Sequence, residues 1–418
     1  MTKLDLRYLM VLNIPVYEWE GGYFTDRLWA HDLRRHLDYI EHITLLCPVH
    51  KERPPTGTVR LDLDQEFRGL RIDGVRPSDA TWKALLRSFS YFRSIYRAAA
   101  KYQVVHSGAM GWPIPLGYYA YLAARILPRF FINFMESSPW RLVPGGRISF
   151  AGRLRARWRA FVMESMAVWI ARNVQMSVFT TEAYRNSMVG EGHPGAHVFK
   201  AVWVTREQVL GRSELEGRLR AKGANSRLAV GFAGRLVAEK GVQILLDALR
   251  RMDPGVSIEV RVLGEGPLEG ELHRFAPSAG CDVSLKFLGV IDNGEQFYRE
   301  VDEWDVAVVP SLSAEQPRIV YDAFARGVPV IASDTSALHE CVQDGTNGFL
   351  FPVGDSEALM RLLVKFARNR ALLAECAFHA LESASAYTHE RMHEDRAVLL
   401  KEAWQKWASR TTKALDTG

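Results

Sequence analysis

The sequence is poor in cysteine and has no long uninterrupted apolar run. Its four cysteines lie far apart in 418 residues and show no spacing typical of metal or disulfide chemistry. We therefore expect small buried or idle thiols. No stretch of about 18 apolar residues without charge occurs, so we expect no transmembrane helix. The cysteines are Cys47, Cys281, Cys341 and Cys376.

The N-terminal segment also lacks the features of a signal peptide. An acid, Asp5, interrupts it, and the apolar run from Tyr8 to Val16 is short and has no small-residue cleavage site. That run is more typical of a buried first strand. We therefore expect a cytoplasmic protein.

Length and charge suggest two domains of different character. A chain of 418 residues exceeds one compact core, and 48% hydrophobic with 24% charged residues is typical of a globular protein. Residues 1–220 contain 31 Lys and Arg against 20 Asp and Glu, whereas the remainder contains 22 against 28. We expect the basic half to meet an anionic partner, a membrane surface or a phosphorylated acceptor. No groove-reading motif is present, so we expect no nucleic-acid partner.

Both halves alternate short apolar runs with helical patterns, which indicates βαβ units and parallel sheets. The second half has strands near residues 226–232, 258–263, 284–288, 306–309 and 329–332, with helices between them. In the first half we expect a strand over 6–14, a helix over 23–37 entered through Gly21 and Gly22, and later strands at 43–47, 104–106, 130–134 and 177–181. A basic, aromatic-rich helix is expected over 153–174.

Two segments of the second half are suited to a phosphorylated sugar. In the first, a strand runs into Gly234, and Arg235 and Lys240 lie in the turn before the next helix, where helix amides and two cations favour a diphosphate. In the second, Glu315 follows a strand and Asp322 lies on the next helix, at the strand ends where α/β sheets bind ligands. Water-facing charges and helix capping are the competing interpretations of these two segments.

The order and spacing of six short motifs resemble family 4 of the nucleotide-sugar glycosyltransferases, also described as glycosyl transferases group 1. The motifs are GRLVAEKG, VLGEGP, FLGVI, VVPSLS, ARGVPVIAS and GTNGFLFPVGD. The resemblance covers about residues 226–366. It implies the α/β GT-B fold, with two Rossmann-like, doubly wound domains facing a central cleft. We expect domains over 1–204 and 205–386, and a helical segment over 387–418 that crosses back to the first domain, although Trp404 and Trp407 could pack on either domain.

The resemblance also implies roles for single residues. Arg235 and Lys240 would hold the donor diphosphate and stabilise the leaving group, Asp322 would bind the ribose diol, and Glu315 would face the transferred sugar. Gly22 would let a loop of the first domain close over the diphosphate. Glu136 would take the place of the family's histidine, or else the acceptor chemistry differs. The remaining donor contacts would come from Gly234, Gly264, Gly266, Val290, Gln316, Pro317, Arg318 and Ile319.

The sequence departs from the family pattern at the acidic pair. Glu315 and Asp322 are separated by six residues where the family has seven, and alignment on Pro317 and Arg318 places Ala314 at the first position. His106 could belong to an acceptor site or be a satisfied histidine at a strand end. Asp26, with its neighbours on the first helix, could line an acceptor pocket or face solvent.

The implied activity is transfer of a sugar, with retained configuration, from a nucleotide-diphosphate sugar to a glycan or lipid-linked acceptor in bacterial polysaccharide or envelope synthesis. No cofactor and no metal site are expected, because no Asp-x-Asp pair lies in the relevant loops; the co-substrate would carry UDP or GDP. Two other functions stay open. One is a catalytically weakened nucleotide-sugar-binding subunit, and the other is an epimerase or phosphorylase of the same architecture.

The predicted helix over 153–174 could bring a lipid-linked acceptor to the enzyme. Arg153, Arg155, Arg157 and Arg159 spread widely around its axis, and Trp158 and Phe161 lie among them. Such a helix could lie on the anionic inner face of the cytoplasmic membrane, or pack its aromatic residues within the first domain.

Overall fold

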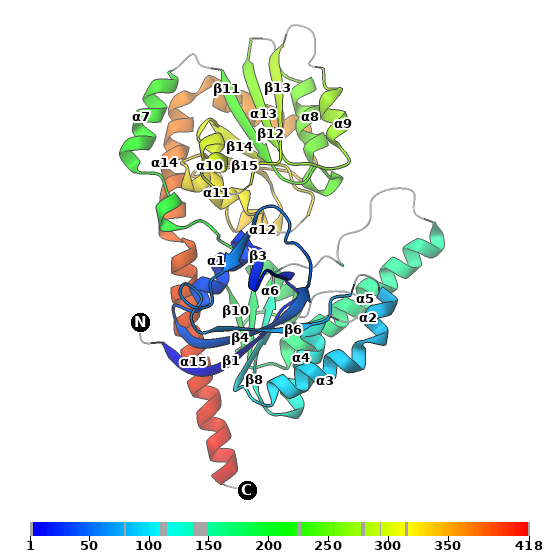
Figure 1. The fold of residues 1–418 in the computed structure, drawn as a ribbon. Coiled ribbons are helices and arrows are strands. Elements are labelled where there is room, and N and C mark those ends of the chain that lie inside the picture. The colour runs from blue at the N-terminus through cyan, green and yellow to red at the C-terminus, as the bar shows by residue number, and fades with distance from the viewer. Residues whose placement is uncertain are drawn as a thin grey trace. The chain divides into compact units, whose positions relative to one another are not determined.

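The computed structural model describes residues 3–78, 81–108, 115–136, 140, 149–223, 227–253, 255–276, 281–292, 294–313 and 317–416. The chain divides into two compact units, one formed by residues 1–200 and 392–418 and the other by residues 201–391. Each unit has its own sheet flanked by helices (Figure 1). The predicted α/β class with two parallel-sheet domains is confirmed.

The first unit contains a ten-stranded sheet in the order β10-β9-β8-β7-β1-β4-β2-β3-β5, with β6 paired to β4. Its central pairs are parallel, whereas β3 is antiparallel to β2 and β5. The strands are β1 (Leu4–Val11), β2 (Val16–Trp19), β3 (Gly22–Asp26), β4 (Ile40–His50), β5 (Thr58–Leu61), β6 (Leu70–Val75), β7 (Val104–Ser107), β8 (Phe130–Met135), β9 (Met176–Phe179) and β10 (Ala196–Val198). The helices are α1 (Arg27–His36), α2 (Thr81–Leu86), α3 (Ser88–Ala99), α4 (Leu116–Ile126), α5 (Phe150–Arg172), α6 (Glu182–Val189) and most of α15 (His389–Asp416).

The second unit contains a six-stranded parallel sheet in the order β13-β12-β11-β14-β15-β16. Its strands are β11 (Leu228–Ala233), β12 (Ser257–Leu263), β13 (Asp282–Gly289), β14 (Val306–Val309), β15 (Val330–Ser333) and β16 (Gly348–Phe351). Its α-helices are α7 (Arg212–Lys222), α8 (Val242–Arg250), α9 (Glu269–His273), α10 (Glu295–Asp302), α11 (Ile319–Ala325), α12 (Ser336–His339), α13 (Ser356–Arg368) and α14 (Arg370–Ala386), and its short 3₁₀ turns are η2 (Arg206–Gln208) and η3 (Ala238–Lys240).

Strand β14 shows why a strand of the second unit can be a continuous apolar run in the sequence. All four of its residues are buried. Val306 and Val308 face one apolar core, and Ala307 and Val309 face another, because successive side chains of a strand point to opposite faces. A parallel sheet covered on both faces needs apolar side chains at every position, not at alternate ones.

The predicted helix over 23–37 is wrong at its start. Strands β2 and β3 form a hairpin through the two-residue turn Glu20-Gly21, both with positive φ, at 48° and 71°. A turn with positive φ at both positions matches the twist of a hairpin, and glycine adopts it without strain. The helix begins only at Arg27. Gly21 therefore belongs to a turn between strands and Gly22 to the start of β3, and neither forms a helix entry.

The C-terminal helix α15 leaves the second unit at its first turn, and its remainder belongs to the first unit. Trp404 and Trp407 both pack edge-on against Phe130 of β8, with ring centroids 5.8 and 5.7 Å away. This decides between the two packing partners that the sequence left open. Among the described residues, no helix is both long and apolar enough to cross a membrane.

Candidate functional site

In the second unit, four loops meet at the carboxyl ends of the parallel strands. The Gly234 N–H donates to the Leu263 carbonyl over 3.0 Å, and the Gly264 N–H donates to the Gly289 carbonyl over 2.7 Å. The loop after β14 joins the turn after β11, because the Leu312 N–H donates to the Glu239 carbonyl over 2.8 Å. Backbone hydrogen bonds thus hold the segments predicted to bind the donor against one another.

Glycines allow this close approach. A Cβ atom on Gly264 would lie 1.9 Å from the Gly234 carbonyl oxygen, and one on Gly266 would lie 2.6 Å from the Leu236 oxygen. Both residues have positive φ, at 132° and 150°. Around Gly234 itself the space is open, since a Cβ atom there would have no other atom within 4 Å. Gly264 and Gly266 therefore have a packing role, while Gly234 leaves room for a ligand.

The two predicted phosphate-binding cations lie in the turn between β11 and α8. Arg235 is mostly exposed and pairs with Glu239, with 2.8 Å between its Nη2 and the carboxylate. Lys240 closes the turn η3 and is half-buried. Gly241 follows in the left-handed conformation at the N-cap position, directly before α8. The turn therefore presents a guanidinium and an ammonium beside a helix N-terminus, where anions are favoured.

Asp322 is more enclosed than a ribose ligand would require. It is 2% exposed, Oδ1 accepts from the Tyr298 hydroxyl over 3.0 Å, and Oδ2 accepts from Arg318 Nε over 3.0 Å. Burial raises the pKa of Asp322, and Arg318 opposes this shift. Each carboxylate oxygen already has one protein partner, so a ribose diol would use the remaining lone pairs.

The other predicted donor contacts are only partly described. Val290 is exposed after β13, Pro317 is half-buried, and Ile319 is buried at the start of α11. Glu315 and Gln316 lie outside the described residues.

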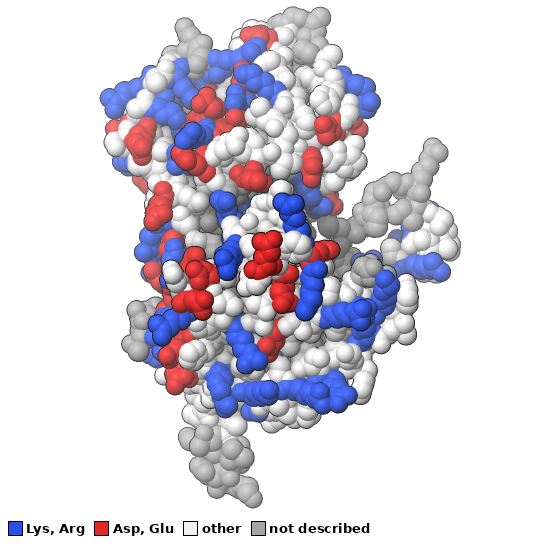
Figure 2. All heavy atoms as spheres, in the orientation of Figure 1, with Lys and Arg blue, Asp and Glu red and all other residues white. Residues whose placement is uncertain are grey.

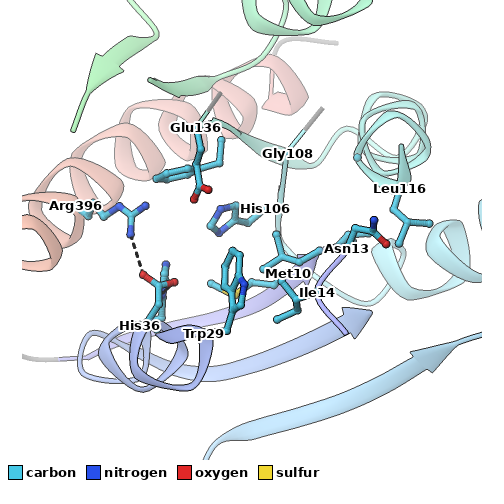
Figure 3. Close-up of a pocket in the computed structure, with 15 residues that line it drawn as sticks. Met10, Asn13, Ile14, Trp29, His36, His106, Gly108, Leu116, Glu136 and Arg396 are labelled. Atoms are coloured by element: carbon cyan, nitrogen blue, oxygen red, sulfur yellow. Dashed lines mark hydrogen bonds and ion pairs between the residues drawn. The ribbon is translucent and has the colours of Figure 1, made fainter. Parts of the chain in front are cut away.

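The first unit contains a pocket with a volume of about 180 Å³ at the carboxyl ends of its central strands. Figure 3 shows His106 and Glu136 pointing into it from the ends of β7 and β8, with Trp29 on the opposite wall. Two residues that the sequence assigned to catalysis or to the acceptor are thus brought together. The full lining is Met10, Val11, Leu12, Asn13, Ile14, Trp29, Asp32, His36, His106, Gly108, Leu116, Gly117, Phe134, Glu136 and Arg396.

Helices α1 and α15 supply a buried charged network at one wall of this pocket. Asp32 Oδ1 lies 3.1 Å from His393 Nε2 and 3.6 Å from Arg396 Nη1, and Asp32 Oδ2 lies 3.3 Å from His36 Nδ1. The Arg396 guanidinium also stacks over the Phe134 ring, 4.1 Å from its centroid. This network fixes one cation and one carboxylate beside the cavity.

Electrostatics keep the two groups at the strand ends in their neutral forms over a wider pH range than usual. Burial, with the nearby His36 and Arg396, holds the pKa of His106 well below 6.5. Its Nδ1 lies 3.0 Å from the Tyr8 hydroxyl. Desolvation and then Asp32 raise the pKa of Glu136, against an opposing effect of Arg396, although part of this residue remains exposed. The arrangement suits an uncharged, hydroxyl-rich ligand.

Asp32, His36 and His393 also form a group with metal-ligand chemistry, with their ligand atoms within 4.8 Å of one another. Arg396 already places a positive charge 3.6 Å from the Asp32 carboxylate. A divalent cation there would meet this repulsion. The pairing of Asp32 with Arg396, together with its contacts to the two imidazoles, explains the group without a metal.

Sequence reasoning missed most of this pocket. Trp29, Asp32 and His36 follow one face of α1 at helical spacing, which was a usable signal. Arg396 lies more than 350 residues away in the sequence, so only the packing of α15 shows that it takes part.

The remaining acceptor-side prediction concerned Asp26. Asp26 caps α1 by accepting from the Leu28 N–H over 2.8 Å, and it is not among the residues that line the described pocket. Gly22 lies at the start of β3, where a Cβ would meet the Arg60 side chain at 2.9 Å. Gly22 thus lies on a strand and not on a loop. Its predicted role in closing over a diphosphate stays a prediction.

Comparisons with known proteins agree with the donor motifs. Residues 227–369 match the family model described as "Glycosyl transferases group 1". This segment therefore resembles the glycosyl transferases group 1 domain. It contains all four loops that meet at the strand ends of the second unit.

Relatives and solved structures extend the similarity. The chain is 29% identical over 144 residues to the amylovoran biosynthesis glycosyltransferase AmsK of Erwinia amylovora, covering 33% of this chain and 35% of AmsK. It is 33% identical over 163 residues to the phosphatidyl-myo-inositol mannosyltransferase of Mycobacterium leprae, covering 37% of this chain and 41% of that protein. The chain thus spans less than half the length of these relatives.

The structure of HepE from Anabaena in complex with UDP has the same fold over nearly the whole chain. It superimposes with a TM-score of 0.66 at 16% identity, covering 95% of this chain and 100% of HepE. The predicted GT-B fold is therefore confirmed.

Proposed function

We propose that this protein is a retaining glycosyltransferase of family 4, which moves a sugar from a nucleotide-diphosphate sugar to a glycan or lipid-linked acceptor. The observation that carries this proposal is the set of loops that presents Arg235 and Lys240 beside the N-terminus of α8, within the segment that matches the glycosyltransferase model. The binding of UDP by HepE supports a nucleotide donor and favours UDP over GDP.

The reaction would depend on electrostatic stabilisation of the leaving diphosphate. As the bond to the sugar breaks, negative charge grows on the phosphate oxygens, and preorganised cations lower the energy of that state. Arg235 would exchange Glu239 for a phosphate oxygen, and Lys240 would supply a second positive charge. These two positive charges would neutralise the phosphate charge that a divalent cation could otherwise neutralise. We therefore propose a metal-independent reaction without a cofactor. The departing phosphate would take the proton of the acceptor hydroxyl.

The pocket of the first unit would bind the terminal sugar of the acceptor. Its volume of about 180 Å³ is that of a small ligand, and Trp29 offers an aromatic wall against which a sugar ring can pack. Glu136 and His106 would accept hydrogen bonds from hydroxyl groups, whereas Arg396 would donate one. The names of the relatives point to polysaccharide and lipid-linked acceptors. We place the reaction in bacterial envelope or polysaccharide synthesis, at the cytoplasmic face of the membrane.

A catalytically weakened, nucleotide-sugar-binding subunit is the second candidate. The enclosed carboxylate of Asp322 favours it, because Tyr298 and Arg318 already occupy this group. Such a subunit would bind the donor and turn it over very slowly.

Donor binding and turnover together test the proposal. UDP-glucose and GDP-mannose are added to the purified protein, and the melting temperature and the release of UDP or GDP are measured. A donor at 100 times its Kd stabilises the folded state by about 2.7 kcal/mol. Arg235→Ala and Lys240→Ala should remove this stabilisation and lower turnover at least about 100-fold, the scale of losing one charge-stabilising donor.

Arg361→Ala is the matched control, because Arg361 is an exposed arginine paired with a glutamate four residues away, as Arg235 is. Unchanged turnover in both loop variants would contradict the mechanism. Stabilisation by a donor without turnover would favour the weakened subunit. NMR of the product with a model acceptor reads the anomeric configuration, and an inverted product would rule out retention.

A further inference from the structure

Helix α5 carries a row of large apolar side chains that the fold leaves exposed. At about 100° per residue, four of them project within about 80° of one another around the helix axis. Trp158 is 62% exposed and Phe161 is 71% exposed. The four residues are Phe150, Leu154, Trp158 and Phe161. The fold packs the opposite side of the helix, where Met163, Ala167 and Ile170 are buried.

The arginines of α5 border this row on both sides. On the same helical projection, Arg153 and Arg157 lie along one edge and Arg155 and Arg159 lie along the other. All four are exposed. The four arginines are spread widely around the helix axis. The apolar row lies in the gap between their two edges. An apolar face flanked by cations is typical of helices that lie in a membrane interface.

Helices α2 and α3 of the same unit add a second exposed apolar group. Trp82, Leu85 and Leu86 on α2 and Phe89 at the start of α3 are each at least half exposed. Lys83 lies over the Trp82 ring, 5.7 Å from its centroid. In Figure 2, Lys and Arg gather on the face of the first unit where Figure 1 places α2 and α3.

A basic hollow adjoins α2. Its volume is about 730 Å³, and four cations line it against one acid. The acid, Glu18, pairs with Lys51 at 3.5 Å, which leaves the charge balance positive. The cations are Lys51, Arg76, Lys83 and Arg87. A positive hollow of this size next to exposed apolar side chains suits a phosphate group attached to an acyl or polyprenyl chain.

We propose that α2, the start of α3 and α5 form a surface that docks on an anionic lipid bilayer, with the hollow receiving a lipid phosphate. The inference rests on the proposed transfer to a lipid-linked acceptor, and it adds the residues that would hold the enzyme at that substrate. Basic side chains near an anionic surface strengthen such binding. A second copy of this chain fits the surface less well, because a symmetric contact would bring the α5 arginines of both copies together.

Vesicle flotation tests this surface. The full chain is mixed with vesicles of phosphatidylglycerol and phosphatidylcholine, or of phosphatidylcholine alone, at low and high salt. We expect binding only to the anionic vesicles and weaker binding at high salt. The double variant Trp158→Ser, Phe161→Ser should lower the partition coefficient at least tenfold, and Arg76→Glu with Lys83→Glu should do the same. Val398→Ser, an exposed apolar residue on α15, is the control.

Circular dichroism and the melting shift with UDP-glucose show whether each variant is folded and binds the donor. A variant that keeps this shift but no longer floats supports the docking surface. A wild-type chain that does not bind anionic vesicles, or a double variant that binds them as well as wild type, overturns the inference. A wild-type dimer that the double variant converts to a monomer also overturns it, in favour of self-association. Loss of the melting shift in the wild-type chain would count against the proposed donor instead.

Discussion

At the scale of single residues, glycine and histidine positions carry most of the information about the two candidate sites. Gly264 was expected to approach a ligand, yet the structure uses its missing Cβ to let two loops touch. The sequence left two roles open for His106, in an acceptor site or as a hydrogen-bonded histidine at a strand end. The structure shows features of both, because His106 forms a hydrogen bond with Tyr8 and also lines the pocket. A residue's type thus indicated that a position matters without indicating what it contacts.

Replacing Gly264 should destabilise the second unit. In Gly264→Ala the new Cβ would lie 1.9 Å from the Gly234 carbonyl oxygen at a φ of 132°, so the loops must move apart. We expect a loss of more than about 1 kcal/mol of unfolding free energy in urea. Gly217→Ala on α7 is the control, since no atom lies within 4 Å of its Cβ and alanine favours a helix by about 0.5–1 kcal/mol. Equal stability of the two variants would contradict the packing role.

Stability should fall in mild acid because His106 and His393 are buried in the neutral form. Both have a pKa well below 6.5 in the folded chain, mainly through desolvation. Below pH 6.5 the unfolded chain therefore binds protons that the folded chain does not, and the free energy of unfolding decreases as pH falls. Each histidine contributes about 1.4 kcal/mol per pH unit.

Urea unfolding between pH 7.5 and 5 measures this slope. His106→Gln keeps a partner for the Tyr8 hydroxyl and cannot titrate, so the slope should become shallower. His273→Gln, at an exposed histidine, serves as the control. A slope that His106→Gln leaves unchanged would show that this imidazole titrates normally.

At the scale of elements, periodicity located most helices and strands, and it failed where a short turn reversed the chain. Strand β3 was read as the start of a helix, because Tyr23 to Leu37 is also compatible with helical periodicity. The parallel strands of the second unit were located within a few residues. Strand β14, for example, is buried on both faces and is therefore an unbroken apolar run in the sequence.

The last helix offers a test at this scale. Trp404→Ala should lower the free energy of unfolding by about 1–3 kcal/mol, less than the 3–5 kcal/mol typical of a fully buried tryptophan, because this ring is half-buried against Phe130. Lys406→Ala, at an exposed position of the same helix, should change stability by no more than about 0.5 kcal/mol. If Trp404→Ala were as stable as wild type, α15 would not depend on this contact with β8.

At the scale of the whole molecule, charge and chemistry divide between the two units. The excess of Lys and Arg in residues 1–220 gathers partly around α2, α3 and α5. The second unit is acidic in sum and nevertheless presents two cations, Arg235 and Lys240, in one turn after β11. Each unit therefore has its own group of cations, for which we propose a lipid surface as the partner of the first and a diphosphate as the partner of the second.

The sequence by itself determined the α/β class, the two-domain organisation and the donor motifs. This was possible because sheet burial, helix periodicity and loop chemistry each depend on residues that are close together in the sequence. Only the tertiary structure decided the pocket of the first unit. Asp32 and Arg396 meet there through the return of α15, and Asp322 turned out to be paired inside the protein with Tyr298. Contacts between residues hundreds of positions apart depend on how helices pack onto a sheet, and that packing leaves no local pattern to read.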